Sequence, residues 1–537
     1  MWNPLNNLTH FSPCLGFSKP ENLIDKCEEY GYTACAITDR MSLAGTISFL
    51  DKAKKSNVKP IIGATFGEVV ALSKNYNGWL NLIQMSSNNN LLNYKEDDSV
   101  ILLVPQKFTN TETLYELEDL FGKDNIFFKE ECGADRPSHY LNKQDKSDYH
   151  TVLSVGRGEA ELELNTEEKR DYYYNSDFEL LSPDIANSFN KQIIYNNEKI
   201  VEQCESYPIS KGLNLPKFPV PGNMSSYDYL VSLARIGWEK KIRGKITKDL
   251  EQTYVDRVKK ELEVIQRVGL DGYFLIVQDY VNWAKDQNWL VGDGRGSSGG
   301  SLVCHLLNIT NVDPIKYGTI FERFYNDGRN TKDRKALPDI DTDFPKFKRH
   351  LVIEYIKNKY GHDKVGQIST YHELKGKSAI TSVMKIHKVA DEKEIKKMTK
   401  YLPSKEDISD MLANDNESSI VRWVLNNEPK ILSDWVSIND EGKIVGDLAQ
   451  YFEQAIRLEG TVVGIGKHAS GIVIAGEPLS QCCPMINDNE GEKITAFDMS
   501  DLEKADFVKF DILGVAVLDK LMGINNLLRF GKINVEE

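Results

Sequence analysis

Three aspartates occupy alternate positions, Asp339, Asp341 and Asp343, in the stretch LPDIDTDF at residues 337–344. Successive side chains of a β-strand point to opposite faces, so these three carboxylates would project from one face of a strand. Like charges repel, but divalent cations can neutralise them, and carboxylate oxygens suit Mg²⁺. The stretch therefore predicts either a metal site or a solvated face of an edge strand.

A glycine-rich loop, GRGSSGGS, covers residues 294–301. Glycine lets backbone N–H groups approach a phosphate closely, and Arg295 and Ser297 supply further donors. The loop lacks the G-K-[ST] ending of a Walker A loop, and it is not the G-x-G-x-x-G of a Rossmann unit. A triphosphate cradle and a turn without a ligand are both compatible with this loop.

The stretch DFVKFDILG places Lys509 and Asp511 two residues apart, on one face of an expected strand. Taken alone, such a pair is usually an exposed ion pair. Beside the acidic stretch and the glycine loop, Asp511 becomes a candidate third metal ligand, and Lys509 a cation near phosphate. Carboxylates for two metal ions, a phosphate loop and lysines together form a set that suits phosphoryl transfer.

The composition is that of a globular protein, with 537 residues, 41% hydrophobic and 27% charged. This length suggests three or four domains. No stretch has the ~18 uninterrupted apolar residues of a membrane span, so we expect no membrane association and a cytosolic protein. Eight cysteines without a C-x-x-C pattern fit neither a disulfide framework nor a zinc ribbon.

Changes in the pattern along the chain predict four regions. Short β-rich runs alternate with helical stretches over residues 1–212, which indicates an α/β domain ending at the proline-rich GLNLPKFPVPGN. A second region covers residues 213–374. A mainly helical segment over 375–457 interrupts it, and strand-like sequence returns over 458–537.

Four separated stretches resemble, in the expected order, the C-family DNA polymerases, which are the bacterial replicative DNA polymerase III alpha subunits. The stretches are VGDGRGSSGGSLVCHLLNITNVDPIKYGTIFERFYN, LPDIDTDF, GKHASGIVIAG and FDMSDLEKADFVKFDILG. The resemblance implies an α/β and α+β multidomain protein, with a polymerase-β-like nucleotidyltransferase palm and an inserted helical thumb. It also implies template-directed nucleotidyl transfer from dNTPs to a primer 3′-hydroxyl.

The same resemblance implies roles for individual residues. Two Mg²⁺ ions would be held by the catalytic carboxylates of Asp341, Asp343 and Asp511. Asp339 matches an acid that lies at the site without binding metal. Contacts to the nucleotide phosphates are implied for Arg295, Gly296, Ser297 and Lys509. The family has a proline where this chain has Asp293, which changes the charge of the loop.

Primer-template DNA is the other implied partner. The net charge of the chain is −14, yet the segment from Lys332 to Lys400 carries 17 Lys or Arg against 10 Asp or Glu. Lys377, Lys396 and Lys397 of this segment would neutralise DNA phosphates, and binding should then weaken as salt rises. The alternative for each of these lysines is a solvated helix face.

The N-terminal region resembles the PHP domain of the same family, in the stretch YTACAITDRMSLAGTISFLDKAKKSNVKPIIGATFG. Active PHP domains bind metals through an H-x-H, a T-D-H and further acids. Here Asn6 and Leu8 occupy the first pair, Arg40 replaces the histidine after Asp39, and Thr65 replaces an acid. A set without these ligands cannot hold metals in the usual way. We therefore expect a PHP-like α/β barrel without nuclease or phosphatase activity.

The family also has a fingers domain after the last catalytic aspartate, whereas 26 residues follow Asp511 in this sequence. A split enzyme whose fingers come from a second polypeptide is the favoured explanation. A shortened chain and a non-catalytic relative are the others.

Further partners and two alternative functions follow from this resemblance. A sliding clamp is expected to bind through the second polypeptide. The expected location is the cytoplasm of a bacterium, or of an infected bacterial host if the chain is phage-encoded. The alternative functions are a polymerase-like DNA-binding subunit without catalysis and a PHP-type phosphoesterase.

Overall fold

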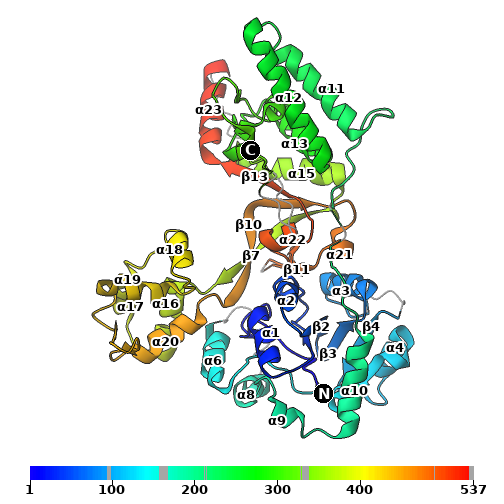
Figure 1. The fold of residues 1–537 in the computed structure, drawn as a ribbon, viewed down its shortest axis with the longest axis vertical. Coiled ribbons are helices and arrows are strands. Elements are labelled where there is room, and N and C mark those ends of the chain that lie inside the picture. The colour runs from blue at the N-terminus through cyan, green and yellow to red at the C-terminus, as the bar shows by residue number, and fades with distance from the viewer. Residues whose placement is uncertain are drawn as a thin grey trace. The chain divides into compact units, whose positions relative to one another are not determined.

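The computed structural model describes residues 1–537 except 93–97, 156–166, 211, 213, 327, 329–337, 489 and 531–537. Two predicted features therefore begin outside the described residues: the acidic stretch at Leu337 and the basic segment at Lys332. The chain divides into two compact units, each with its own strands and helices (Figure 1). The predicted multidomain α/β fold is confirmed.

The first unit comprises Met1–Ile209, Thr370–Gly466 and Pro484–Glu492. Its five-stranded sheet has the order β1 (Ala34–Ile37), β2 (Lys59–Phe66), β3 (Val69–Ser73), β4 (Val100–Val104) and β5 (Ile126–Phe128). The β1/β2 and β4/β5 pairs are parallel, whereas β3 is antiparallel to both neighbours. Every residue of β3 and β4 is buried, and their apolar sequences, VVALS and VILLV, are typical of strands covered on both faces.

Helices surround this sheet in the first unit (Figure 1). Their bounds are α1 Pro20–Glu29, α2 Thr46–Ala53, α3 Tyr76–Asn88, α4 Glu112–Phe121, α5 Lys129–Cys132, α6 Lys146–Val155, α8 Glu167–Asn175, α9 Pro183–Ala186 and α10 Lys191–Gln203. Leu23, Ile24 and Cys27 of α1 recur at helical spacing and are buried in one cluster with Ile37 and Phe49. The strand β11 (Met485–Asn487) also belongs to this unit.

A second group of helices belongs to the first unit as well. The bounds are α16 Gly376–His387, α17 Glu392–Thr399, α18 Ser409–Asn414, α19 Ile420–Asn427 and α20 Ala449–Leu458, with a hairpin of β8 Ser437–Ile438 and β9 Ile444–Val445. Arg457 of α20 donates hydrogen bonds of 2.6 and 3.1 Å to the buried Asp148 of α6. Gln454 donates to the same carboxylate at 2.9 Å. These contacts join the segment expected as an inserted helical domain to the N-terminal region.

The second unit comprises Ser210–Ser369, Lys467–Cys483 and Lys493–Glu537. Its helices are α11 Ser226–Lys241, α12 Lys248–Val268, α13 Asp271–Asp286, α14 Leu302–Leu306, α15 Arg349–Tyr360, α21 Leu479–Cys482, α22 Met499–Lys504 and α23 Ala516–Phe530. Five strands lie wholly or partly in this unit, in the order β12 (Lys493–Thr495), β7 (Val365–Glu373), β10 (Val462–Ile474), β13 (Lys509–Val515) and β6 (Thr342–Pro345); β7 belongs to it up to Ser369 and β10 from Lys467. At one edge of the sheet, β13 is antiparallel to β10 and parallel to the edge strand β6.

The acidic stretch is a strand over only part of its length. Pairing with β13 begins at Thr342, so Asp339 and Asp341 lie in the extended segment before β6. The backbone N–H of Ile340 donates to the buried Tyr273 hydroxyl at 3.0 Å, which takes the place of a bond to a neighbouring strand. The first two aspartates are therefore anchored by helix α13 and the third by the sheet.

Among the described residues, every helix is too short or too polar to traverse a lipid bilayer.

Candidate active site

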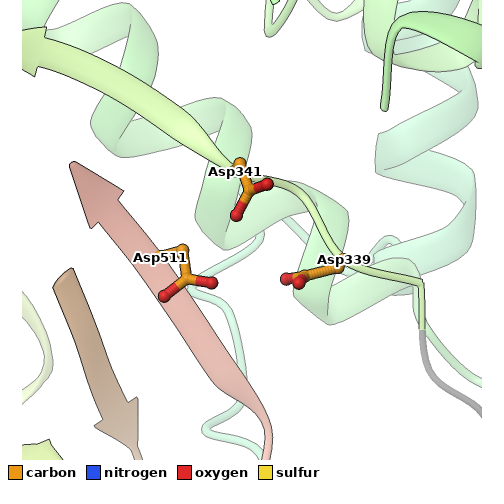
Figure 2. Close-up of side chains that lie close together, drawn as sticks. All are labelled: Asp339, Asp341 and Asp511. Atoms are coloured by element: carbon orange, nitrogen blue, oxygen red, sulfur yellow. The ribbon is translucent and has the colours of Figure 1, made fainter. Parts of the chain in front are cut away.

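Three carboxylates from two segments meet in the second unit. Figure 2 shows Asp339 and Asp341, from the segment before β6, turned toward Asp511 of β13. One oxygen of each carboxylate lies within 4.8 Å of an oxygen of each of the others. The register explains the meeting, because Ile512 pairs with Thr342 and brings the preceding residues of both segments to one end of the strand pair.

Burial and mutual repulsion shape the electrostatics of this group. Asp511 is 6% exposed, and its partner in the adjacent strand β10 is Gly471. Burial, the charge of Asp339 and the hydrogen bond with Asp511 together raise the pKa of Asp341 to about 6, although Lys509 acts in the opposite direction. Three carboxylates this close together concentrate negative charge, which favours a bound cation.

Lys509 supplies a cation from within the protein. Its Nζ atom lies 2.7 Å from Asp511 Oδ2 and 3.2 Å from Asp339 Oδ2, and its side chain is 12% exposed. Burial disfavours the charged form, but the hydrogen bond with Asp511 and the charge of Asp339 outweigh burial and raise the pKa of Lys509. The lysine predicted to lie near phosphate is thus held by two of the carboxylates.

Asp343 lies outside this group of three. Its carboxylate is 3.4 Å from the guanidinium of Arg295, which is half-exposed. The sequence assigned the metal to Asp341, Asp343 and Asp511, whereas the side chains that meet are those of Asp339, Asp341 and Asp511. The expected ligand set stays a prediction.

The glycine-rich loop packs directly against the acidic segment. The backbone N–H of Gly292 donates to Asp343 O at 2.9 Å. Gly296 has a φ of +60°, and a Cβ atom there would lie 3.2 Å from Asp341 Oδ2. Residues Gly296–Gly300 form a 3₁₀-helix in which Ser297 is partly buried. Only glycine combines this backbone angle with so close an approach. The predicted phosphate loop therefore adjoins the carboxylates.

Two residues of α12 that the sequence analysis missed hold the loop in place. Glu261 is fully buried and accepts hydrogen bonds from the Ser301 hydroxyl and from the backbone N–H groups of residues 302 and 303, at 2.8 to 3.0 Å. Arg257 donates to Glu261 at 2.7 Å and to Gly300 O at 2.6 Å. The sequence offered one indication of this role: Glu261 is an acid next to the apolar stripe of α12, and it follows Arg257 by four residues.

The three lysines expected to bind DNA belong to the first unit. Lys377 lies on α16, and Lys396 and Lys397 lie on α17. All three side chains are exposed, and none forms an ion pair with a described residue. Their role stays a prediction.

The positions that replace the PHP metal ligands converge in the first unit. Asn6, Leu8, Arg40 and Thr65 all line one cavity of about 600 Å³. Asp39 is buried and accepts hydrogen bonds from Thr9 and Ser12, so its carboxylate is engaged within the protein. Over the described part of the chain, groups of three possible metal ligands occur only at the carboxylate site and in a turn at residues 488–492.

Known proteins resemble both units. Residues 228–514, more than half of the chain, match the bacterial DNA polymerase III alpha NTPase domain, and residues 5–126 match the PHP domain.

Three curated relatives are each named DNA polymerase III subunit alpha. Those of Aquifex aeolicus (strain VF5), Ureaplasma parvum serovar 3 and Bacillus subtilis (strain 168) are 30%, 31% and 29% identical over 97%, 98% and 95% of this chain. The matches cover 52%, 51% and 48% of the relatives, so the chain spans about half the length of the curated relatives it matches. The resemblance inferred from the motifs is confirmed, and the chain belongs to the bacterial DNA polymerase III alpha family.

Proposed function

We propose that the second unit carries the catalytic centre for template-directed transfer of nucleotides from dNTPs to a primer 3′-hydroxyl. The observation that carries this proposal is the contact between the carboxylate group and the glycine-rich loop, made by Gly296 against Asp341. A phosphate bound by the loop would lie beside the carboxylates, as nucleotidyl transfer requires.

The residues present fit divalent metal ions. Aspartate oxygens are the hard ligands that Mg²⁺ prefers. The pKa of Asp341 is raised first by burial and then by the charge of Asp339, and a bound cation would favour its ionised form. We assign the ions to Asp341, Asp343 and Asp511. Two Mg²⁺ ions bound there would activate the primer 3′-hydroxyl and stabilise the leaving pyrophosphate.

The protein groups around the carboxylates would orient the triphosphate. Arg295 is half-exposed and only 3.4 Å from Asp343, a weak contact that it can exchange for a phosphate oxygen. That exchange would free Asp343 to join the other two ligands. The Ser297 hydroxyl and the backbone N–H of Gly296 would donate to the same phosphates. Lys509 would neutralise charge that develops during transfer.

The exposed lysines of α16 and α17 support DNA binding by the first unit. Lys377, Lys396 and Lys397 are exposed and form no ion pair with a described residue, so their charge is available to phosphates. Contacts of this kind release counterions and make affinity fall with salt concentration.

An apolar stripe on α23 supports a second polypeptide. Val517, Leu521, Ile524 and Leu528 recur at spacings of four, three and four, and their side chains are 54%, 45%, 51% and 80% exposed. Exposed stripes of this spacing pack against other helices. The proposed occupant is a polypeptide corresponding to the half of the relatives that this chain does not span, which would provide the fingers and the contact to a sliding clamp.

Primer extension by this chain together with that second polypeptide tests the proposal. Asp341→Asn should abolish extension in the presence of Mg²⁺ while leaving primer-template binding intact, because only a metal ligand is lost. Lys443→Gln, at an exposed lysine paired with Glu441, is the matched control and should extend normally. Undiminished extension by Asp341→Asn would instead favour a DNA-binding subunit without catalysis.

A further inference from the structure

The cavity where PHP ligands are replaced presents positive charge. Besides Arg40, it is lined by Lys107, Lys129 and Lys169. Lys107 is paired with Glu68 at 2.6 Å, and Glu130 accepts a hydrogen bond from the backbone of Gln106. These contacts engage two of the three acids that line the cavity, and the third, Asp135, is exposed.

Lys129 is a cation of this cavity that forms no ion pair within the described part of the chain. It begins helix α5, and its ammonium group forms no hydrogen bond or ion pair with a described residue. Burial lowers the pKa of Lys129 to about 8, although Cys132, Glu68 and Glu130 act in the opposite direction. A partly buried ammonium without a partner is costly in the folded protein, and an anion entering the cavity would relieve that cost.

The inner wall of the cavity is neutral. Burial and the charge of Arg40 lower the pKa of His139 to about 3, so this ring carries no charge at neutral pH. His139 lies 2.9 Å from the Tyr149 hydroxyl and stacks on Phe178 with ring centroids 4.1 Å apart. Asn6 donates to Ala134 O at 2.8 Å. Because His139 and Asn6 carry no charge, Arg40 and the lysines of the cavity determine which charge it binds.

We propose that this cavity binds the phosphate group of a small molecule without a metal ion, with Arg40 and Lys129 facing the phosphate. Two cations replace the charge that metal ions would supply to a phosphate. The volume of about 600 Å³ suits a ligand of nucleotide size. Tyr172, which is half-exposed at the cavity, offers an aromatic face on which a base can stack. Inorganic phosphate and a nucleoside monophosphate share the recognised group.

Calorimetric titration of the full chain tests this site. The probes are inorganic phosphate and thymidine 5′-monophosphate, each added in EDTA so that no divalent ion contributes. The variants are Lys129→Gln, which removes the charge, and Lys129→Arg, which keeps it. Lys54→Gln is a matched control, because Lys54 is an exposed lysine of the same unit, paired with Asp51 at 2.9 Å. Every titration uses a chain that also carries Arg295→Gln, so that phosphate bound by the glycine-rich loop of the second unit contributes less to the measured heat.

Binding with Kd below ~1 mM is expected for at least one probe. Lys129→Gln should weaken it at least ~10-fold, Lys129→Arg should retain most of it, and Lys54→Gln should leave it unchanged. Tighter binding of the nucleotide than of phosphate would identify the base as part of the ligand, and equal binding would identify phosphate alone. Absence of binding, a requirement for divalent metal, or equal binding by Lys129→Gln would overturn the proposal.

Discussion

Lys509 and Asp511 form an ion pair of 2.7 Å inside the carboxylate group of the second unit. Both side chains are shielded from solvent, so salt and water screen the pair less than they would at the surface. The ammonium group therefore compensates part of the repulsion among the aspartates when no metal ion is present.

Replacing Lys509 should make the protein depend on metal ions for stability. Lys509→Met removes the internal cation, and we expect the free energy of unfolding to fall by ~1–3 kcal/mol in EDTA. Millimolar Mg²⁺ should recover much of that loss. Thermal unfolding with and without Mg²⁺ measures both effects, with Lys443→Met as the control. Equal melting temperatures of variant and parent in EDTA would rule out this role.

Substitution of each aspartate by asparagine should distinguish the three expected metal ligands from Asp339, which is expected to lie at the site without binding metal. Asp341→Asn, Asp343→Asn and Asp511→Asn are each expected to slow primer extension roughly a thousandfold, since each removes a metal ligand. Asp339→Asn should retain activity within about tenfold. Single-turnover extension rates provide the measurement. If Asp339→Asn slowed extension more than Asp343→Asn, the metal would be assigned to Asp339, Asp341 and Asp511, the three carboxylates that lie together in the structure.

A charge on the apolar face of α23 should weaken assembly. Ile524→Glu places a carboxylate in the middle of the exposed stripe, so its burial in an interface becomes unfavourable. We expect at least tenfold weaker association with the second polypeptide, measured by calorimetry, while the melting temperature of the chain alone stays the same. Asn525→Glu, at an exposed polar position of the same helix, is the control. Unchanged affinity of Ile524→Glu would place the partner elsewhere.

Three lysines should account for part of the salt dependence of DNA binding. If Lys377, Lys396 and Lys397 each neutralise one phosphate, replacing all three with glutamine reduces the slope of log affinity against log salt by about 3. Fluorescence anisotropy with a primer-template over a range of salt concentrations gives this slope. A triple variant with the parent's slope would leave these lysines as solvated helix faces.

Anion binding in the first unit should weaken as the pH rises. The pKa of Lys129 is lowered to about 8, because burial outweighs the opposite effects of Glu68, Glu130 and Asp135. The ammonium is charged below that pH, and a bound anion favours the charged form. Affinity should thus be constant below about pH 7 and decrease above pH 8. Titration with sulfate, whose charge is constant in this range, measures the effect, and Lys129→Arg should abolish it.

The sequence by itself identified the family and the local chemistry. Alternate aspartates, a loop of closely spaced glycines and a Lys-x-Asp pair are short patterns that indicate possible chemistry without knowledge of the fold. Their order along the chain matched one family, and the helical and strand regions followed from apolar spacing. The replacement of the PHP metal ligands could also be identified, because the absence of a histidine or acid at a motif position is visible in the sequence without knowledge of the fold.

Only the tertiary structure decided which side chains meet. Strand pairing begins at Thr342 because the Tyr273 hydroxyl engages the preceding backbone, and this leaves Asp339 inside the carboxylate group. Asp343 faces Arg295, which comes from a distant loop. The pKa of Lys129 likewise depends on how deeply the fold buries its ammonium group and on which acids the fold brings near it. Such contacts join residues far apart in the chain, so no local pattern encodes them.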